Sequence, residues 1–213
     1  MNVFALAHPH DLLELDGAAP YFDTQPPPWA EQALERAPWV TVRRAIGAPD
    51  AIPTGVRGVE RNQRWAASVS IRKIKRIMHP WDILDACRKN DLPREKTIPA
   101  MRALHALMTS WDTAGYAWGP AGSIGFELAT GVASATPKSD LDLVLHGEKP
   151  MSYSTALTLS AAFEGCGVRV DALVETAECG FSLLEYVREN GGPILLRTAR
   201  GPRLGRDPWS VLP

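Results

Sequence analysis

The chain has 213 residues and a formal net charge of −1 at pH 7, because its 23 Lys and Arg almost balance its 24 Asp and Glu. Apolar residues make up 45% of the sequence and charged residues 22%, which is typical of a globular protein and excludes a largely disordered chain. The charge balance argues against a globally basic nucleic-acid binder, and no apolar run approaches the roughly 18 residues of a membrane span. Three cysteines without a CxxC pair, and an N-terminus without a basic signal region, predict a cytoplasmic protein with no nucleic-acid or membrane partner.

The N-terminal part of the chain, residues 1–90, is predicted to be a small β-rich domain. Residues 39–43 (WVTVR) and, more weakly, residues 66–78 have the pattern of short strands. Residues 20–28 (PYFDTQPPP) are expected to be loop, because proline lacks an amide donor and fixes φ. Residues 90–99 (NDLPREKTIP) are polar and contain two prolines, so we predict a linker there.

The C-terminal part, residues 97–213, alternates between predicted helices and strands. Its first helix is expected to have Thr97 as its cap and Pro99 in its first turn. The expected helices are residues 97–111, 152–163 and 181–189, the expected strands are residues 115–118, 140–145, 168–174 and 193–197, and residues 201–203 are expected to be loop. This alternation predicts an α/β (α+β) fold in which helices pack on a mixed sheet.

Asp140 and Asp142 are the most informative residues of the sequence, since they lie in the otherwise apolar run DLDLVL. Side chains alternate between the two faces of a strand, so both carboxylates face the same way, about 7 Å apart. Two such carboxylates repel each other unless solvent, a cation or a basic group offsets their charge. The pattern favours a Mg²⁺ site, and a solvated strand end is the alternative.

Three further features carry chemistry or structure. Gly122 and Ser123 follow a predicted strand. The glycine lets a ligand come close to the backbone and the serine offers a hydroxyl, so the pair can bind a phosphate. The alternative is an ordinary turn. Asp171 lies within the apolar strand VRVDALV and needs a partner, either in catalysis or in a salt bridge to an arginine. His8 and His10, in HPHD, have no third metal ligand nearby, so hydrogen-bonded structural roles are expected for them.

Residues 97–213 resemble the nucleotidyltransferase superfamily typified by DNA polymerase β. The shared order is a strand, Gly-Ser, a helix, a strand with DxD, a helix, and a strand with a third Asp. In that superfamily Gly-Ser holds a triphosphate and three carboxylates hold two metals, so the resemblance implies these roles for the matching residues Gly122, Ser123, Asp140, Asp142 and Asp171. One departure is the longer gap between Gly-Ser and DxD, which contains the extra stretch 127–138 (ELATGVASATPK).

Nearly the whole chain resembles a narrower family, the holo-acyl-carrier-protein synthase of malonate decarboxylase, a phosphoribosyl-dephospho-CoA nucleotidyltransferase. The segments that carry the resemblance are HPHDLLEL, VTVRRA, PTGVRGVERNQRWAA, GSIGFELATG, SDLDLVL, VDALVETAECGFSLLEYV and PILLRTARGPRLG. The family implies transfer of a 2′-(5″-phosphoribosyl)-3′-dephospho-CoA group from its triphosphate precursor to a serine of the acyl carrier subunit, with release of diphosphate. Asp140 and Asp142 would bind Mg²⁺, and a second Mg²⁺ or Asp171 would help to deprotonate the serine.

A local excess of basic residues fits this expectation. Between residues 57 and 76 seven basic residues stand against one acid, Glu60. If the segment is helical, Arg57, Arg61 and Arg64 share a face and can bind phosphates. The remaining four basic residues of the segment are Arg72, Lys73, Lys75 and Arg76. Lys138, beside the DxD, is a further candidate for binding phosphate. The four would dock an acidic carrier, and a solvated basic surface is the alternative.

Two other functions remain open from the sequence. The first is a nucleotidyltransferase for another acceptor, such as the citrate lyase carrier, or for an ordinary nucleotide. The second is a non-catalytic nucleotide- or RNA-binding module on the same fold, which the basic segment would suit. The Gly-Ser, DxD and third Asp favour an enzyme, because a binding module has no need of a metal pair.

Overall fold

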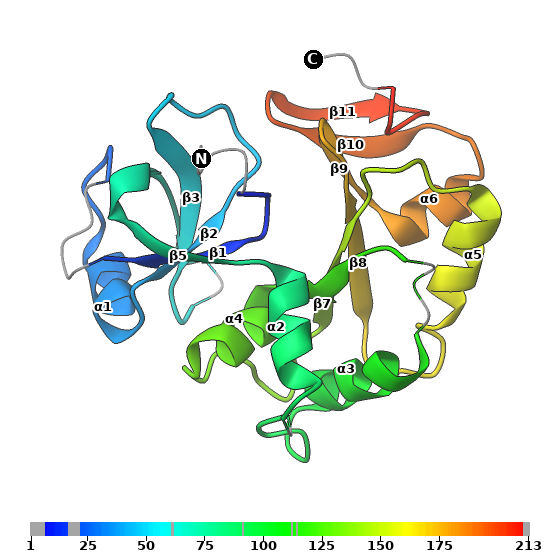
Figure 1. Cartoon of the computed structure of the whole chain (residues 1–213), viewed down its shortest axis with the longest axis horizontal. Helices are drawn as coiled ribbons and strands as arrows, with labels where there is room; N and C mark the ends of the chain where they lie inside the picture. The colour runs from blue at the N-terminus through cyan, green and yellow to red at the C-terminus, as the bar shows by residue number, and fades with distance from the viewer. Residues whose placement is uncertain are drawn as a thin grey trace.

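The structure is a computed structural model that describes residues 7–16, 22–60, 62–90, 92–111, 113 and 115–210. Figure 1 shows two lobes, each built around one β-sheet. Arg61, one of the predicted phosphate contacts, lies outside the described residues. In the part of the chain that is described, no helix combines the length and apolarity that crossing a membrane requires.

The N-terminal lobe is an antiparallel sheet with strand order β4-β3-β2-β1-β5. Its elements are β1 (Leu12–Leu15), α1 (Pro28–Arg36), β2 (Trp39–Val42), β3 (Ala51–Arg57), β4 (Arg64–Ser70), a 3₁₀ turn (Ile71–Lys73) and β5 (Ile74–Met78). Alternate residues of β3 are buried, so that one face of the sheet forms a core with α1. The predicted β-rich character of this half is confirmed, although α1 was not predicted.

The C-terminal lobe is a mixed sheet with strand order β11-β10-β9-β8-β7-β6, in which β7 and β8 are parallel. Its strands are β6 (Trp118–Pro120), β7 (Leu141–His146), β8 (Val170–Glu175), β9 (Cys179–Ser182), β10 (Ile194–Thr198) and β11 (Gly201–Gly205). Its helices are α2 (Pro80–Cys87), α3 (Pro99–Ser110), α4 (Gly122–Thr130), α5 (Tyr153–Ala161) and α6 (Leu183–Glu189). The predicted α+β class, with helices packed on a mixed sheet, is confirmed.

Several predicted boundaries are wrong for local reasons. Thr97 does not cap α3, because Ile98 is the residue before the helix and the Thr97 hydroxyl donates to the Arg94 carbonyl at 3.1 Å. The strand expected at 115–118 begins only at Trp118, after a turn in which the Tyr116 amide bonds the Thr113 carbonyl at 3.0 Å. Residues 201–203 are not loop, because they pair with β10 as an antiparallel hairpin.

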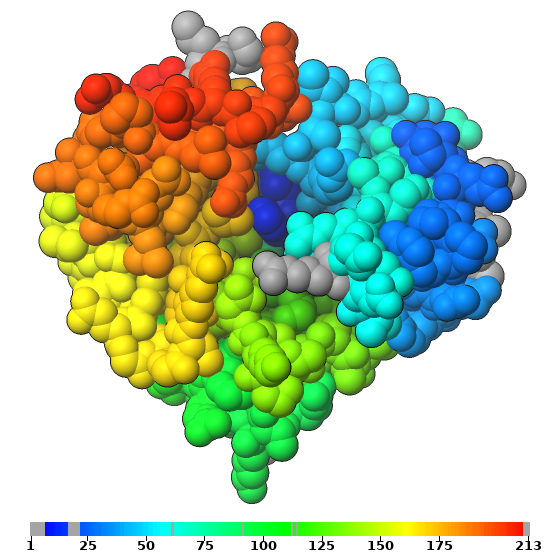
Figure 2. Space-filling model, turned by 180° about the vertical axis from the view of Figure 1, so that it is seen from behind, coloured from blue at the N-terminus to red at the C-terminus, as the bar shows by residue number. Residues whose placement is uncertain are grey.

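One face of the C-terminal sheet packs against the hydrophobic core, and the other carries carboxylates. On one face of β7, Leu141, Leu143 and Leu145 are fully buried in the core, and α3 packs against this strand. The opposite face of β7 and β8 carries Asp142 and Asp171 at one end. The N-terminal lobe contacts this second face, and Figure 2 shows a hollow between the lobes with the first described residues, in dark blue, deep within it. Asp142 and Asp171 therefore lie on the face of the sheet where the lobes meet.

Candidate functional site

Three carboxylates meet at the start of β7 and β8. Asp142 and Asp171 lie opposite each other in the parallel pair, and Asp140 directly precedes β7. One ligand oxygen from each of Asp140, Asp142 and Asp171 lies within 4.8 Å of the others. Strand alternation predicted the common direction of Asp140 and Asp142, and the parallel β7–β8 register adds Asp171 to them.

The electrostatics of this carboxylate group favour a bound cation. Burial, and then the neighbouring charges of Asp140 and Asp171, raise the pKa of Asp142, while Arg57 and His10 act in the opposite direction. Oxygen-only donor sets of carboxylates suit hard divalent cations such as Mg²⁺. The donor set therefore fits Mg²⁺, with ligands from both strands and from the residue before β7.

The Gly122 backbone touches the carboxylate group. Gly122 has a left-handed φ of 57°, and a Cβ placed on it would lie 1.9 Å from Asp142 Oδ2. The Ala121 amide donates to the Asp142 carbonyl at 2.9 Å, which fixes the beginning of α4 beside β7. Because the first amides of a helix have no carbonyl one turn earlier, they can bind an anion at this end of α4. The helix predicted to begin at Gly122-Ser123 is present, and the pair lies beside the carboxylates.

The extra stretch between Gly-Ser and DxD is the end of α4 and a loop folded back onto it. Glu127 is buried, and its Oε2 accepts hydrogen bonds from the amides of Ser134 at 2.8 Å and Ala135 at 2.9 Å. Arg94 donates to both oxygens of the same carboxylate at 2.9 and 3.0 Å. The Ser134 hydroxyl bonds the Ser123 carbonyl at 2.8 Å. The stretch is thus an ordered wall of the site, and it carries the exposed Lys138 just before the carboxylates.

Arg57 and Arg64 lie on a β-hairpin, so the helix considered for this segment is wrong. Arg57 ends β3, Arg64 begins β4, and the two are directly opposite each other in the antiparallel pair. Opposite residues in such a pair share a face, and like charges placed this way repel unless an anion lies between them. Both side chains are exposed, and Arg57 is close enough to lower the Asp142 pKa. The hairpin therefore brings basic groups from the other lobe toward the carboxylates.

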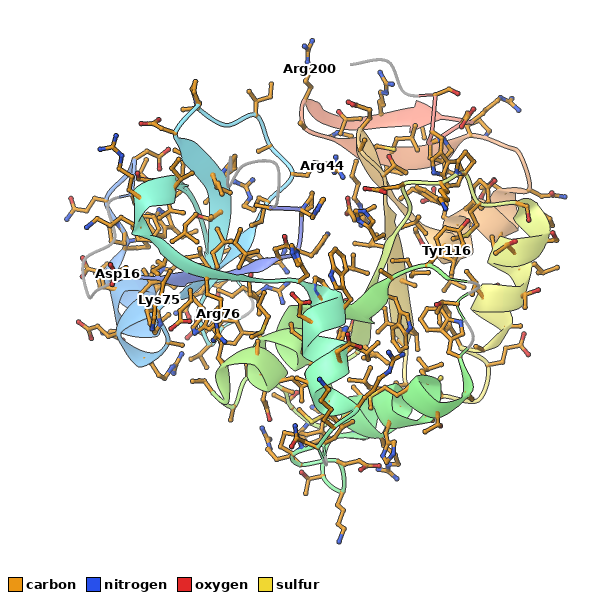
Figure 3. The ribbon with its side chains drawn as sticks, viewed as in Figure 1. Asp16, Arg44, Lys75, Arg76, Tyr116 and Arg200 are labelled. Carbon is orange, nitrogen blue, oxygen red and sulfur yellow. The ribbon has the colours of Figure 1, made fainter. Side chains whose placement is uncertain are left out.

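Two further basic residues of the segment, Lys75 and Arg76, pair with an acid of their own lobe. Lys75 Nζ and Arg76 Nε each lie 3.0 Å from a different Glu14 oxygen, and Arg76 also lies 5.0 Å over the Trp39 ring. Figure 3 shows Lys75 and Arg76 near Asp16 on the outer part of the N-terminal lobe. The hydrogen bond from Lys75 is the main cause that lowers the Glu14 pKa. The excess of positive charge is therefore divided between two surfaces.

A buried ionic contact between the lobes was not predicted from the sequence. Glu175, at the end of β8, accepts hydrogen bonds at Oε2 from Arg44 Nε at 3.1 Å and from Arg44 Nη2. Arg44 also bonds the carbonyls of Thr176 at 2.8 Å and Ala177 at 3.2 Å, and Figure 3 places it between the lobes. His10 Nε2 lies 3.1 Å from Glu175 Oε1. Burial opposes ionisation of Glu175, but His10 and Arg44 together hold its pKa below the usual range.

Comparison with known proteins identifies the family. Residues 8–80 match the family model described as the N-terminal domain of the phosphoribosyl-dephospho-CoA transferase MdcG, and residues 87–208 match the model of its C-terminal domain. The chain belongs to the MdcG family of phosphoribosyl-dephospho-CoA transferases. It is therefore a transferase, as the resemblance implied.

Curated relatives of this MdcG-family chain match along most of its length. A phosphoribosyl-dephospho-CoA transferase of Pseudomonas aeruginosa is 37% identical, over 95% of this chain and 94% of the relative. A relative with the same name in Pseudomonas fluorescens is 37% identical, over 95% of this chain and 93% of its own length. Another in Klebsiella pneumoniae is 34% identical, over 96% of this chain and 97% of its own length. No solved structure matches.

Aromatic and histidine side chains fill another part of the lobe contact in this MdcG-family enzyme. His8 and His146 meet edge to face with centroids 4.9 Å apart, and His79 stacks on Trp81 at 4.6 Å. His79 Nδ1 also lies 2.9 Å from Oδ2 of the buried Asp11. This contact with Asp11 is the main cause that raises the His79 pKa. The structural role expected for His8 is consistent with these contacts.

Proposed function

We propose that this enzyme transfers the 2′-(5″-phosphoribosyl)-3′-dephospho-CoA group from its triphosphate precursor to a serine of the malonate decarboxylase acyl carrier subunit, and releases diphosphate. Family membership supports the transferred group, and the resemblance described above supports the acceptor. The observation that carries the proposal is the group of three carboxylates beside the N-terminus of α4. Such an arrangement suits a triphosphate, whose charge a cation and helix amides can share.

Asp140, Asp142 and Asp171 are the residues that would hold Mg²⁺. The bound cation would offset the negative charge of the phosphate oxygens during transfer. The first amides of α4 and the Ser123 hydroxyl would hold the triphosphate, next to the carboxylate of Asp142.

The basic residues at the rim would bind the remaining phosphates. Arg57 and Arg64 approach from the hairpin of the N-terminal lobe, and Lys138 approaches from the loop before β7. Arginine can bind phosphate through two parallel N–H groups, which fixes orientation as well as charge. Arg61 belongs to the same proposed set by its place in the sequence. The acceptor serine would enter through the hollow between the lobes that Figure 2 shows.

The reaction exchanges one phosphorus–oxygen bond for another. The serine Oγ attacks the α-phosphorus and forms the new bond, while the bond to the leaving diphosphate breaks. The nucleophile belongs to the carrier subunit, so this chain needs to supply only binding groups, orientation and a proton acceptor. We expect the reaction to take place in the cytoplasm.

The test is the intact mass of the apo carrier subunit after incubation with the enzyme, the triphosphate precursor and Mg²⁺. The expected result is a mass gain of one phosphoribosyl-dephospho-CoA group, lost with EDTA and with Asp140→Asn. Asp85→Asn is a matched control, because Asp85 is exposed on α2 and pairs with Arg88 outside the site. Transfer to a citrate lyase carrier alone, or precursor binding without transfer to any carrier, would contradict the proposal.

A further inference from the structure

We propose that His10 is the general base that accepts the proton of the acceptor hydroxyl, and that Glu175 is the residue that positions it. The inference rests on the proposed transfer to a serine and names the residue that completes it. The sequence predicts a hydrogen-bonded structural role for His10, and no sequence motif indicates a role for Glu175.

The contact between the two side chains fixes which nitrogen of His10 is available. His10 Nε2 lies 3.1 Å from Glu175 Oε1, so in the neutral ring Nε2 carries the hydrogen that is donated to the carboxylate. Nδ1 then holds the free electron pair. A carboxylate that orients an imidazole in this way also stabilises the cation formed when the ring accepts a proton.

Glu175 is itself held firmly. Its side chain is only 7% exposed, and the Arg44 guanidinium binds its other oxygen. Arg44 is in turn anchored by the carbonyls of Thr176 and Ala177. Because Glu175 lies on β8, four residues beyond Asp171 and on the same face, the anchor is attached to the strand that carries the candidate metal ligand.

The His10 backbone is strained in a way that points to function. Its φ is 75°, a left-handed value that few residues other than glycine adopt, and its amide donates to the Val42 carbonyl at 3.0 Å. Such backbone strain clusters at active sites, ligand clamps and switch regions. The His10 side chain remains 31% exposed, so it is accessible from solvent.

The charges around His10 suit a proton acceptor near the reaction. Among the described histidines, His10 is the one whose charge acts on the Asp142 carboxyl. The acidic Glu175 lies beside the ring, the acidic Asp142 lies near enough to interact with its charge, and the basic Arg44 binds the other oxygen of Glu175. These opposing charges come from both lobes, and they surround the type of side chain that exchanges a proton most readily near neutral pH.

The alternative base, Asp171, is already engaged. Arg169 donates to Asp171 Oδ1 from Nε at 3.2 Å and from Nη2 at 2.9 Å. Asp171 thus already has a guanidinium partner on one oxygen, in addition to its place in the group of three carboxylates. In the proposed step the serine Oγ–H proton moves to His10 Nδ1 and the Oγ–P bond forms. The bond to diphosphate then breaks with its electron pair, and the imidazolium later loses its proton to solvent.

The strained backbone suggests the variant for the test. His10→Gly removes the ring at a position whose φ suits glycine, and His10→Asn keeps a side chain that tolerates this φ but cannot act as a base. Single-turnover transfer to the apo carrier is followed from pH 5 to pH 9, with and without imidazole. Precursor binding and thermal melting are measured on the same samples. His105→Asn is the matched control, since His105 lies on the surface of α3 beside Glu95.

We expect both His10 variants to lose roughly 10²–10⁴-fold in the rate of transfer, as for removal of a general base, with precursor binding within threefold of wild type. The acidic limb of the wild-type pH profile should disappear, and imidazole should restore part of the His10→Gly rate at pH values where imidazole is neutral. Glu175→Gln should move the acidic limb to lower pH, because the protonated ring loses its partner.

Each other outcome counts against the inference. A folded His10→Gly variant with the wild-type rate, or with an unchanged acidic limb, would overturn it. A slow variant that imidazole does not rescue, together with an equally slow His10→Asn with the wild-type profile, would make His10 structural. If the wild-type enzyme transfers nothing to the carrier while it binds the precursor, the proposed function fails first, and this inference fails with it.

Discussion

Asp142 on β7 and Asp171 on β8 are direct partners in the parallel pair of strands, and both face the N-terminal lobe. Parallel strands keep equivalent positions side by side, so two carboxylates at matching positions must share one small volume. Burial, and then the negative charges of Asp140 and Asp171, raise the pKa of Asp142. The same closeness makes the position useful for holding a cation.

The first prediction concerns stability without metal. Because the folded-state pKa of Asp142 is raised, ionisation of this carboxyl disfavours the folded state at neutral pH. Asp142→Asn should therefore melt about 2–4 °C higher than wild type at pH 7 in EDTA, which corresponds to about 1 kcal/mol. The gain should vanish at pH values below the ordinary pKa of Asp, where the wild-type carboxyl is protonated in both states. A lower melting temperature for the variant at pH 7 would contradict this reasoning.

The second prediction concerns addition of metal. A ligand that binds only the folded state at 100 times its dissociation constant adds about 2.7 kcal/mol of stability. Mg²⁺ should therefore raise the melting temperature of wild type, and EDTA should reverse the rise. Asp142→Asn and Asp171→Asn should respond weakly, whereas Asp85→Asn should respond as wild type does. An equal response in all four proteins would place the cation elsewhere.

The third prediction separates backbone strain from steric contact at two glycines. Gly122→Ala should reduce transfer more than about 100-fold, because the new Cβ would meet the Asp142 carboxylate and move it. Gly131→Ala is the matched control, since Gly131 has a φ of 73° but a Cβ added there would meet nothing within 4 Å. It should cost only about 1 kcal/mol of stability, for the left-handed backbone, and keep its activity. Equal losses of activity in both variants would show that contact with Asp142 is irrelevant.

The fourth prediction divides the basic residues by function. Arg57→Gln should raise the KM for the precursor about tenfold and weaken its dependence on salt, because one phosphate contact is lost. Arg76→Gln should leave this KM within about twofold, because Arg76 is paired with Glu14 on the outer surface. The measurement is initial rate against precursor concentration at two ionic strengths. An unchanged KM in Arg57→Gln would remove the hairpin from the phosphate site.

The fifth prediction concerns the contact between the lobes. Arg44→Gln leaves Glu175 buried with fewer partners, which should cost about 3 kcal/mol of stability at pH 7. The Glu175 pKa lies below its usual value, so this contribution is complete above the usual value and is lost as the pH falls through the lowered one. Denaturant unfolding at pH 7 and pH 3 measures the difference. Arg88→Gln is the control, because its pair with Asp85 is exposed and should contribute at most about 0.5 kcal/mol.

Local patterns in the sequence predicted the parts of the site that lie close together along the chain. Strand alternation gives Asp140 and Asp142 a common direction, and the order of elements in the superfamily implies a helix after Gly122-Ser123, where α4 begins. The prolines of residues 20–28 predict a loop and so hide the beginning of α1, and α2 is not predicted from the sequence. Pro28 and Pro80 stand in the first turn of these helices, where a missing amide costs nothing, rather than in loops.

Contacts between distant segments were beyond the reach of local patterns. His10 and Glu175 are separated by 165 positions, and no local periodicity relates them. Arg57 and Arg64 do share a face, but through a hairpin that the spacing of arginines does not encode. One available signal was the spacing of Asp171 and Glu175, which places both on the same side of a strand as soon as the strand is recognised.

The even spacing between Asp171 and Glu175 also limits how this enzyme can change. A residue inserted into or deleted from β8 moves all later side chains of the strand to the opposite face of the sheet. A single insertion between Asp171 and Glu175 would therefore turn one of these two side chains toward the helices on the other face. Only changes by two residues preserve both, and these move the lobe contact by about 7 Å relative to the carboxylates. Changes in length that keep both the carboxylate group and the lobe contact in place are therefore expected in the loops on either side of β8.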